Sequence, residues 1–86
     1  MIKKTFKSHA NTGFARQASY LSNASSMFNA KLLITYQGNS VYIRKSPDSI
    51  MDILSLYILP GAYFSICADG IDEKIALETI EDILFD

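Results

Sequence analysis

The residues best suited to chemistry lie in the segment Thr12–Ala18 (TGFARQA), where a turn glycine precedes a predicted helix and Arg16 falls in its first turn. The N-terminus of a helix presents unpaired N–H groups and a partial positive charge, so anions such as phosphate bind there readily. A side chain would also have to carry the phosphate as a nucleophile, and Phe14 and Ala15, which cannot do so, stand beside the glycine. The only histidine, His9, precedes the turn. The segment therefore predicts an anion-binding helix start that lacks its nucleophile.

The composition is that of a small globular chain. It has 86 residues, of which 49% are hydrophobic, and a net charge of −1, which argues against disorder and against sequence-independent nucleic-acid binding. No apolar run approaches the roughly 18 residues that span a bilayer, and no signal-peptide pattern follows the first lysines. One cysteine, Cys67, and one histidine are too few for a disulfide framework or a structural zinc site. We therefore expect a single cytoplasmic domain, residues 1–86, without cofactor, metal, nucleic-acid or membrane partner.

Hydrophobic periodicity predicts four strands and three helices. The strands are expected over residues 2–9, 31–37, 41–44 and 62–69, and the helices over residues 14–27, 48–57 and 73–85. The order βαββαβα places the helices on one face of a mostly antiparallel four-stranded sheet and leaves the other face open. The expected class is α+β.

Turn and cap residues support these boundaries. Asn11 or Thr12 is expected to cap the first helix, Ser46 with Pro47 to begin the second, and Asp72 to cap the third. Further boundaries come from glycine and proline: Gly38–Ser40 as a hairpin turn, Pro60–Gly61 as the end of the second helix, and Gly70 as a turn.

Several short motifs occur in a fixed order along the chain: Lys4–Lys7, Thr12–Ala18, Ser49–Leu56, Pro60–Ala62 and Gly70–Glu73. Together they resemble HPr, the histidine-containing phosphocarrier family of the bacterial sugar phosphotransferase system, over essentially the whole chain. The resemblance implies an open-faced β-sandwich and a protein that is not an enzyme.

The segment at the first helix departs from the family pattern. The family has glycine, an aliphatic residue, histidine, alanine and arginine, whereas here one position is missing and Phe14 stands between Gly13 and Ala15. Arg16 matches the arginine that supports the phosphoryl group. The resemblance therefore implies no catalytic residue at this position. His9 is either a relocated phosphoacceptor or an exposed histidine at the end of a strand.

The resemblance also implies a regulatory site and a docking surface. Ser49 matches the serine that a dedicated kinase phosphorylates, although Asp48 and Asp52 flank it and the segment Arg44–Pro47 is inserted ahead of it. A histidine-less paralogue in the family, the catabolite-repression HPr, keeps this serine and binds a transcriptional regulator. The expected partners are phosphotransferase-system enzymes, the serine kinase or such a regulator. The expected anion- or partner-binding residues are Phe14, Arg16, Ile50 and Leu54; for Phe14, packing against the core is the alternative.

The open sheet face is a second candidate surface. Strand parity places Leu33, Tyr42, Tyr63 and Cys67 on the side without helices. Aromatic residues are enriched at interfaces. The presence of Leu33, Tyr42 and Tyr63 therefore predicts that the open face contacts a partner, which includes a second copy of the chain. Cys67 is expected to be a small, inert strand residue. Two alternatives to a regulatory paralogue remain: a phosphocarrier that uses His9, and a dimerising module without phosphate chemistry.

Overall fold

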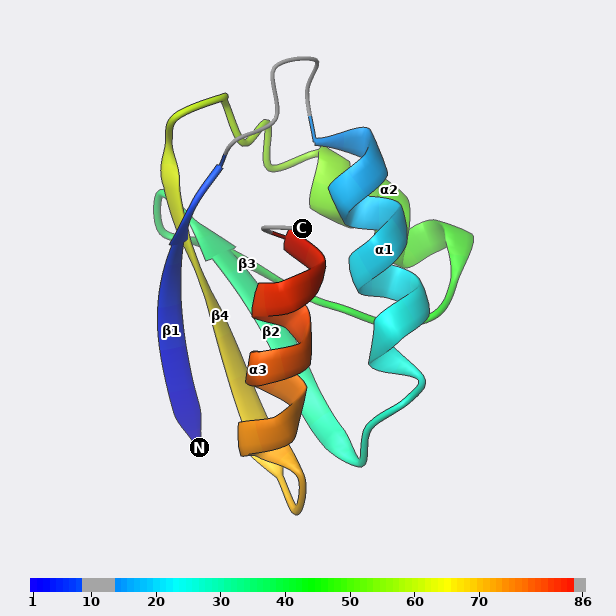
Figure 1. Cartoon of the computed structure of the whole chain (residues 1–86). Coiled ribbons are helices and arrows are strands. Elements are labelled where there is room, and N and C mark those ends of the chain that lie inside the picture. Colours follow the sequence, from blue (N-terminus) through cyan, green and yellow to red (C-terminus); the bar gives the residue numbers. More distant parts are fainter. Residues whose placement is uncertain (9–13, 85–86) are drawn as a thin grey trace.

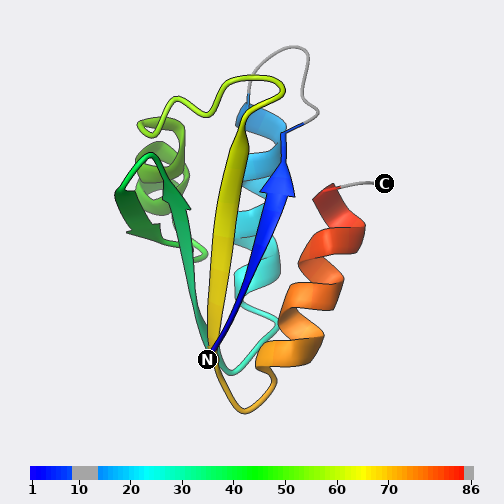
Figure 2. The ribbon, with the colours of Figure 1, turned by 90° about the vertical axis from the view of Figure 1, so that its left-hand side faces the viewer.

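The computed structural model describes residues 1–8 and 14–84. The sheet contains four strands and three helices lie beside it: β1 (Ile2–Lys7), α1 (Ala15–Ser25), β2 (Ala30–Tyr36), β3 (Asn39–Tyr42), α2 (Pro47–Leu54), β4 (Tyr63–Gly70) and α3 (Glu73–Leu84) (Figure 1). The strand order is β1-β4-β2-β3, and all neighbouring strands are antiparallel. The helices lie on one side of the sheet, and Figure 2 shows the sheet from its uncovered side. The predicted βαββαβα order and open-faced sandwich are confirmed.

The core lies between the sheet and the helices. Alternate residues of each strand face the helices, because successive side chains of a strand point to opposite faces. The helices contribute one apolar stripe each, which buries residues spaced three or four apart. The buried side chains include Phe6, Leu32, Ile34, Phe64 and Ile66 from the strands, and Ala18, Leu21, Ile53, Ala76 and Ile80 from the helices.

The turn between β2 and β3 falls one residue earlier than predicted. Gln37 (φ 51°) and Gly38 (φ 81°) form it, and β3 starts at Asn39. Two consecutive positive φ angles give a two-residue turn whose twist matches that of the flanking strands. A turn over 38–40 would pair Val41 with Gln37 instead of Ile34 and turn its side chain, which packs against the core, to the open face.

Helix α2 begins as predicted and ends earlier. The Ser46 hydroxyl accepts a hydrogen bond from the Ser49 N–H at 3.1 Å, and Pro47 is the first helical residue. The helix ends at Leu54 rather than at residue 57, before Pro60 is reached. Tyr57 adopts a left-handed backbone (φ 55°) and its N–H donates to the Leu54 carbonyl, which terminates the helix.

The start of α1 differs from the predicted caps, whereas Asp72 stands at the N-cap position of α3 as predicted and its carbonyl accepts a hydrogen bond from the Ala76 N–H at 2.9 Å. Phe14 occupies the N-cap position of α1 and makes no side-chain capping bond; Asn11 and Thr12 lie outside the described residues. The Asp72 carboxylate accepts a hydrogen bond from the Asn29 N–H at 3.0 Å, so it ties the entry of β2 to the start of α3. Gly70 is the last residue of β4 rather than a free turn, and a Cβ there would collide with the Asn29 carbonyl oxygen.

Candidate docking surface

Phe14 belongs to the core. Its side chain is 5% exposed, and the edge of its ring packs against Phe64 with the centroids 5.3 Å apart. Phe64 in turn stacks on Phe6 at 5.8 Å. The prediction that Phe14 anchors a partner needs correction, because its ring is buried among other aromatic rings. Packing against the core, the alternative reading, describes its position.

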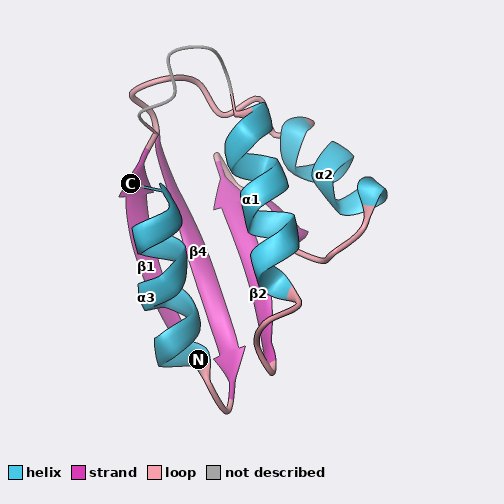
Figure 3. Cartoon of the chain, turned by 45° about the vertical axis from the view of Figure 1, so that its right-hand side comes forward, coloured by secondary structure: helices cyan, strands magenta, loops and turns pink. Residues whose placement is uncertain are grey.

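Arg16 is exposed on the first turn of α1, on the side that faces α3. It lines a hollow of about 450 Å³ together with Gln17, Tyr20, Ile83 and Leu84. In the described part of the chain its guanidinium makes no ion pair, so it remains free to meet an anion. The structure does not bring it together with the predicted docking residues of α2, which pack against the opposite side of α1 (Figure 3).

Two parts of the predicted phosphate chemistry, His9 and Gly13, lie outside the described residues. Within residues 1–8 and 14–84, no group of three or more His, Cys, Asp or Glu side chains could hold a metal ion. The same residues include no helix that is long and apolar enough to cross a membrane.

Ser49 is buried, with 4% of its surface exposed. Its hydroxyl accepts a hydrogen bond from the Arg44 N–H at 2.8 Å and donates one to the Tyr42 carbonyl at 3.0 Å. Phosphorylation of Ser49 stays a prediction, and its hydroxyl is enclosed in this conformation. Ser49 connects the end of β3 to α2, and Ser46 is the capping residue.

A second buried serine, Ser22, holds the same segment from the other side. It is 1% exposed, and its hydroxyl donates to the Arg44 carbonyl at 2.6 Å. Ser22 and Ser49 together fix both backbone polar groups of Arg44. The sequence contained a signal for this bond, because Ser22 lies next to Leu21 and four residues after Ala18 on the buried side of α1, and a buried hydroxyl requires a partner.

Half-buried and exposed apolar side chains of α2 and the segment after it make up a group that we call the α2 patch: Ile50, Met51, Leu54, Tyr57 and Leu59. Ile50 and Leu54 are half-buried and pack against the edge of the core, as a docking helix requires. Met51, Tyr57 and Leu59 are 65%, 80% and 62% exposed. The sequence indicated Ile50 and Leu54; Tyr57 and Leu59 were missed because they were assigned to the helix end and its stop signal.

The backbone of Tyr57 is in the left-handed region, with a φ of 55°. It is one of two non-glycine residues with positive φ in the described chain, and a bulky side chain in the left-handed region is disfavoured by about 1 kcal/mol or more. Its ring gains little from packing in return, because most of it is exposed. Such strain is concentrated at functional sites, so a binding role for Tyr57 is a hypothesis that this conformation supports.

The open face carries the predicted residues. Leu33 pairs with Tyr42 on β3 and with Cys67 on β4, so these side chains lie in one row across the sheet. Tyr42 and Tyr63 are 50% and 66% exposed, which confirms their position but leaves their role a prediction. Each tyrosine lies under a cation: the Arg44 guanidinium is 5.0 Å from the Tyr42 ring, and the Lys7 amine is 5.9 Å from the Tyr63 ring.

Comparisons with known proteins agree with this geometry. The family model described as PTS HPr component phosphorylation site matches residues 2–86. The crystal structure of HPr-C-His from Thermoanaerobacter tengcongensis is 27% identical, with a TM-score of 0.82 over 98% of this chain and 91% of that chain. The phosphocarrier HPr of Bacillus anthracis is 28% identical, with a TM-score of 0.79 over 96% and 95%.

A third structure is that of Crh, the catabolite repression containing protein of Bacillus subtilis. It is 26% identical, with a TM-score of 0.69 over 92% of this chain and 83% of that chain. It is described as a dimer that is intertwined through a swapped domain. The matched set thus contains phosphocarriers and one protein of catabolite repression.

Proposed function

The chain belongs to the HPr family of the phosphotransferase system, whose members are phosphocarriers rather than enzymes, and we propose that it acts by protein–protein contact instead of histidine phosphotransfer. Its partners would be phosphotransferase-system enzymes, a serine kinase or a transcriptional regulator. The α2 patch is the docking surface. The site of action is the cytoplasm, where these partners work.

The observation that carries this proposal is the strained, exposed Tyr57 at the end of α2. Met51 and Leu59 are exposed on the same helix and the segment that follows it, and Ile50 and Leu54 form its half-buried base. Aromatic and methionine side chains are enriched at the centres of protein interfaces. The exposed residues have no packing role in the isolated chain, so a partner is the simplest reason for their presence.

The environment of Phe14 supports the loss of histidine phosphotransfer. Phenylalanine has no nitrogen that could accept a phosphoryl group, and its ring is packed against Phe64. Arg16 is exposed beside it in the helix start, where it could contact an acidic group of a partner. A phosphocarrier that uses His9 is the competing function, and it makes a distinct chemical prediction.

Regulation through Ser49 is part of the proposal. Because the Ser49 hydroxyl is buried and bonded to Arg44 and Tyr42, a kinase would reach it only after the end of β3 separates from α2. The phosphate would then meet the N-terminus of α2, which favours anions, and the carboxylates of Asp48 and Asp52, which repel them. We therefore expect slow phosphorylation, with a large conformational effect at Arg44.

The docking surface is tested by measuring binding to the first enzyme, the serine kinase and the transcriptional regulator of the phosphotransferase system by calorimetry. Met51→Glu should abolish the strongest of these interactions. Ile75→Glu is the matched control, because Ile75 is also an apolar helix residue, 59% exposed, but lies on α3. Equal binding by both variants and the unchanged protein, or no binding to any of the three, would remove the α2 patch from consideration.

The chemistry is tested by intact-mass spectrometry after two incubations, one with phosphoenolpyruvate and the first enzyme and one with ATP and the serine kinase. A phosphate added only by the kinase and lost in Ser49→Ala would support the regulatory role. A phosphate from phosphoenolpyruvate that is lost in His9→Ala would establish the carrier function instead. No phosphate in either reaction would leave a binding module without phosphate control.

A further inference from the structure

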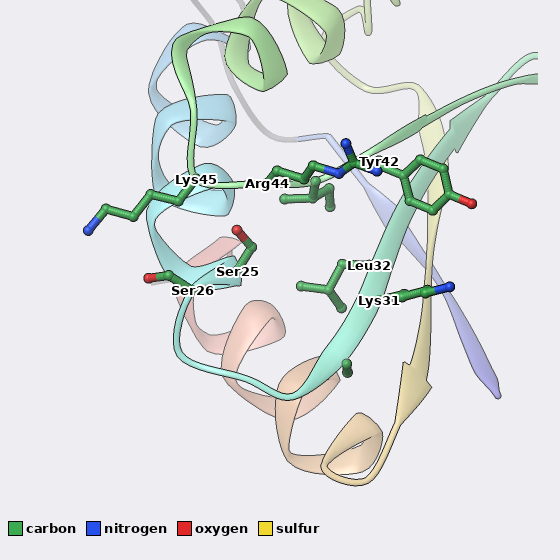
Figure 4. A pocket seen from close by; sticks show the side chains of 9 residues that line it. Ser25, Ser26, Lys31, Leu32, Tyr42, Arg44 and Lys45 are labelled. Atoms are coloured by element: carbon green, nitrogen blue, oxygen red, sulfur yellow. The ribbon is translucent and has the colours of Figure 1, made fainter.

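A groove lies between the end of α1, the first residues of β2 and the segment that leaves β3 (Figure 4). Its volume is about 410 Å³, within the range of about 300 to 1,000 Å³ typical of ligand sites. Leu32 and Ile43 form its apolar floor, and Ser25 and Ser26 form the wall at the end of α1. We call it the edge groove; it lies apart from the α2 patch and shares no residue with it.

The charged side chains that line the edge groove are all positive: Lys31, Arg44 and Lys45. In the described part of the chain none of them makes an ion pair. Asp69 on β4 is the register partner of Lys31 on β2. Its carboxylate lies 3.7 Å from the N-terminal amine. Figure 4 shows Arg44 extending to the Tyr42 ring and Lys31 extending to the same side below that ring, whereas Lys45 extends to the opposite side, beside α1. The groove is therefore lined by three cations and has one carboxylate, that of Asp69, opposite Lys31 on the neighbouring strand.

Arg44 is held in place rather than loosely attached to the surface. The buried hydroxyls of Ser22 and Ser49 bond its carbonyl and its N–H, and its guanidinium lies 5.0 Å from the centre of the Tyr42 ring. The two buried serines thus fix the backbone of Arg44 beside the groove, and the Tyr42 ring lies next to its guanidinium. Such preorganisation reduces the entropy that a ligand must overcome on binding.

One residue of β2, Ala30, extends past the end of β3 on the side of the groove. The Ile43 N–H donates to the Leu32 carbonyl at 2.9 Å, and the β2–β3 pairing goes no further. Since Leu32 bonds toward β3, strand alternation turns the N–H and carbonyl of Ala30 toward the same edge, beyond the end of β3. An edge with free hydrogen-bonding groups is a template for another extended chain.

The serine hydroxyls favour a peptide over a bare phosphate. Ser25 and Ser26 already donate their hydrogens to the Ser22 and Asn23 carbonyls, so they can only accept further bonds. They also lie at the C-terminal end of α1, where the helix dipole repels anions. The hydroxyls of Ser25 and Ser26 can therefore accept hydrogen bonds from the backbone N–H groups of a peptide. Acidic side chains of the same peptide can pair with the cations of the groove.

We propose that the edge groove binds an acidic, extended polypeptide segment that pairs with the free edge of β2. Its alternating side chains would place carboxylates beside Lys31 and Arg44 on the open face and apolar groups over Leu32 and Ile43. Pairing supplies affinity through the backbone, and the cations select the sequence. This site is independent of the proposed docking by the α2 patch.

The test uses the whole chain, isotopically labelled, and a blocked octapeptide of alternating Glu and Val. Titration should shift the amide signals of Ala30, Leu32 and Arg44, and Arg44→Gln and Lys31→Gln should each weaken binding about tenfold, as for close charge pairs. Lys74→Gln is the matched control, because it removes the same charge on α3, and we expect a change below about twofold.

Two further probes separate this proposal from its rivals. The same peptide with alternate amides N-methylated keeps every carboxylate but cannot pair with β2, so it should lose most of the binding. Stronger binding of inorganic pyrophosphate or of a single-stranded oligonucleotide than of the peptide would overturn the proposal, as would equal binding of the methylated peptide. Met51→Glu should leave the titration unchanged, which keeps this result separate from the α2 patch.

Discussion

Tyr57 holds a φ of 55° and exposes 80% of its side chain, so it strains the backbone without filling the core. Glycine adopts this conformation freely, whereas a tyrosine there is disfavoured. Tyr57→Gly should therefore raise the free energy of unfolding by about 1 kcal/mol, measured by urea denaturation. The same variant should bind the partner of the α2 patch more weakly.

Tyr57→Ala is the control for this prediction. It removes the ring but keeps a Cβ in the left-handed region, so binding should fall without a gain in stability. A Tyr57→Gly variant that is less stable than the unchanged protein would show that the ring packs in the native state more than its exposure indicates.

Ser22 and Ser49 are coupled through one residue. Ser49→Ala leaves the Arg44 N–H and the Tyr42 carbonyl without their partner. Ser22→Ala removes one of two bonds to the Arg44 carbonyl, which also accepts from the Ser46 N–H at 3.0 Å. Each buried group that loses its bond costs about 1 to 3 kcal/mol, so both variants should be destabilised, Ser49→Ala more. Because both serines hold the same peptide segment, the double variant should lose less than the sum, which a denaturation double-mutant cycle measures. Strict additivity would mean that the two serines act independently.

At the scale of single residues, the sequence predicted on which face a side chain lies better than it predicted which residues surround that side chain. Parity placed Tyr42 and Tyr63 on the open face, and Ser46 was recognised as a cap from its place before a proline. The burial of Phe14 and Ser49 could not be read from the sequence. Their partners, Phe64 and Arg44, are brought to them by the tertiary fold, and no local pattern records such contacts.

Gly70 shows how one position constrains two elements. It ends β4 opposite Ala30, and the start of β2 approaches it so closely that a Cβ would overlap the Asn29 carbonyl oxygen and the Ala30 Cα. The obstacle is backbone, which cannot rotate away. Gly70→Ala should therefore destabilise the chain by about 1 to 3 kcal/mol, measured by thermal or urea unfolding. Ser65→Ala, on the same strand but facing the open side, should change stability far less; equal losses would contradict the steric explanation.

An ion pair links β1 to α3. The N-terminal amine lies 2.9 Å from the Glu73 carboxylate; the bond to Glu73 raises the pKa of the amine above 8.0, and the same bond lowers the pKa of Glu73 below 4.5. The raised pKa stabilises the fold below pH 8.0 and loses this effect as the pH rises past the folded value. The lowered pKa stabilises it above pH 4.5 and loses this effect as the pH falls.

The pair should therefore contribute between about pH 4.5 and pH 8.0, and only weakly, because both groups are exposed to solvent. In Glu73→Gln, the unfolding midpoint should fall less with pH, both below and above this window, than it does in the unchanged protein. Glu78→Gln, an exposed carboxylate on the same helix, should leave the profile unchanged. A profile that is identical in Glu73→Gln and the unchanged protein would show that the pair does not persist in solution.

At the scale of elements, the order and type of all seven were predictable, because each has a clear periodicity of 2 or 3.6 residues. The residues at which the elements begin and end were less predictable. Helix α2 stops at Leu54 because Tyr57 turns left-handed, an event that no local propensity of tyrosine would indicate. Asp72 stands at the predicted N-cap position of α3, but its carboxylate bonds to Asn29, which lies 43 positions away in the sequence.

The distribution of charge over the whole molecule bears on self-association. The open face carries Lys3, Lys7 and Lys31, which pair in register with Cys67, Tyr63 and Asp69, and Arg44 lies over Tyr42 at its margin. Two open faces brought together would therefore oppose positive charges across the interface. The apolar and aromatic residues of that face favour contact, and the charges oppose it.

Ionic strength decides between these two effects, because salt screens the charges and leaves the apolar term intact. We expect sedimentation velocity to show a monomer at low salt and increasing dimer at high salt, with the dimer weakened by Tyr63→Asp. A dimer that is already present at low salt and indifferent to Tyr63→Asp would exclude the open face as the contact. Association would then have to run through another route, such as exchange of an element between two copies, which like charges on the open face do not oppose.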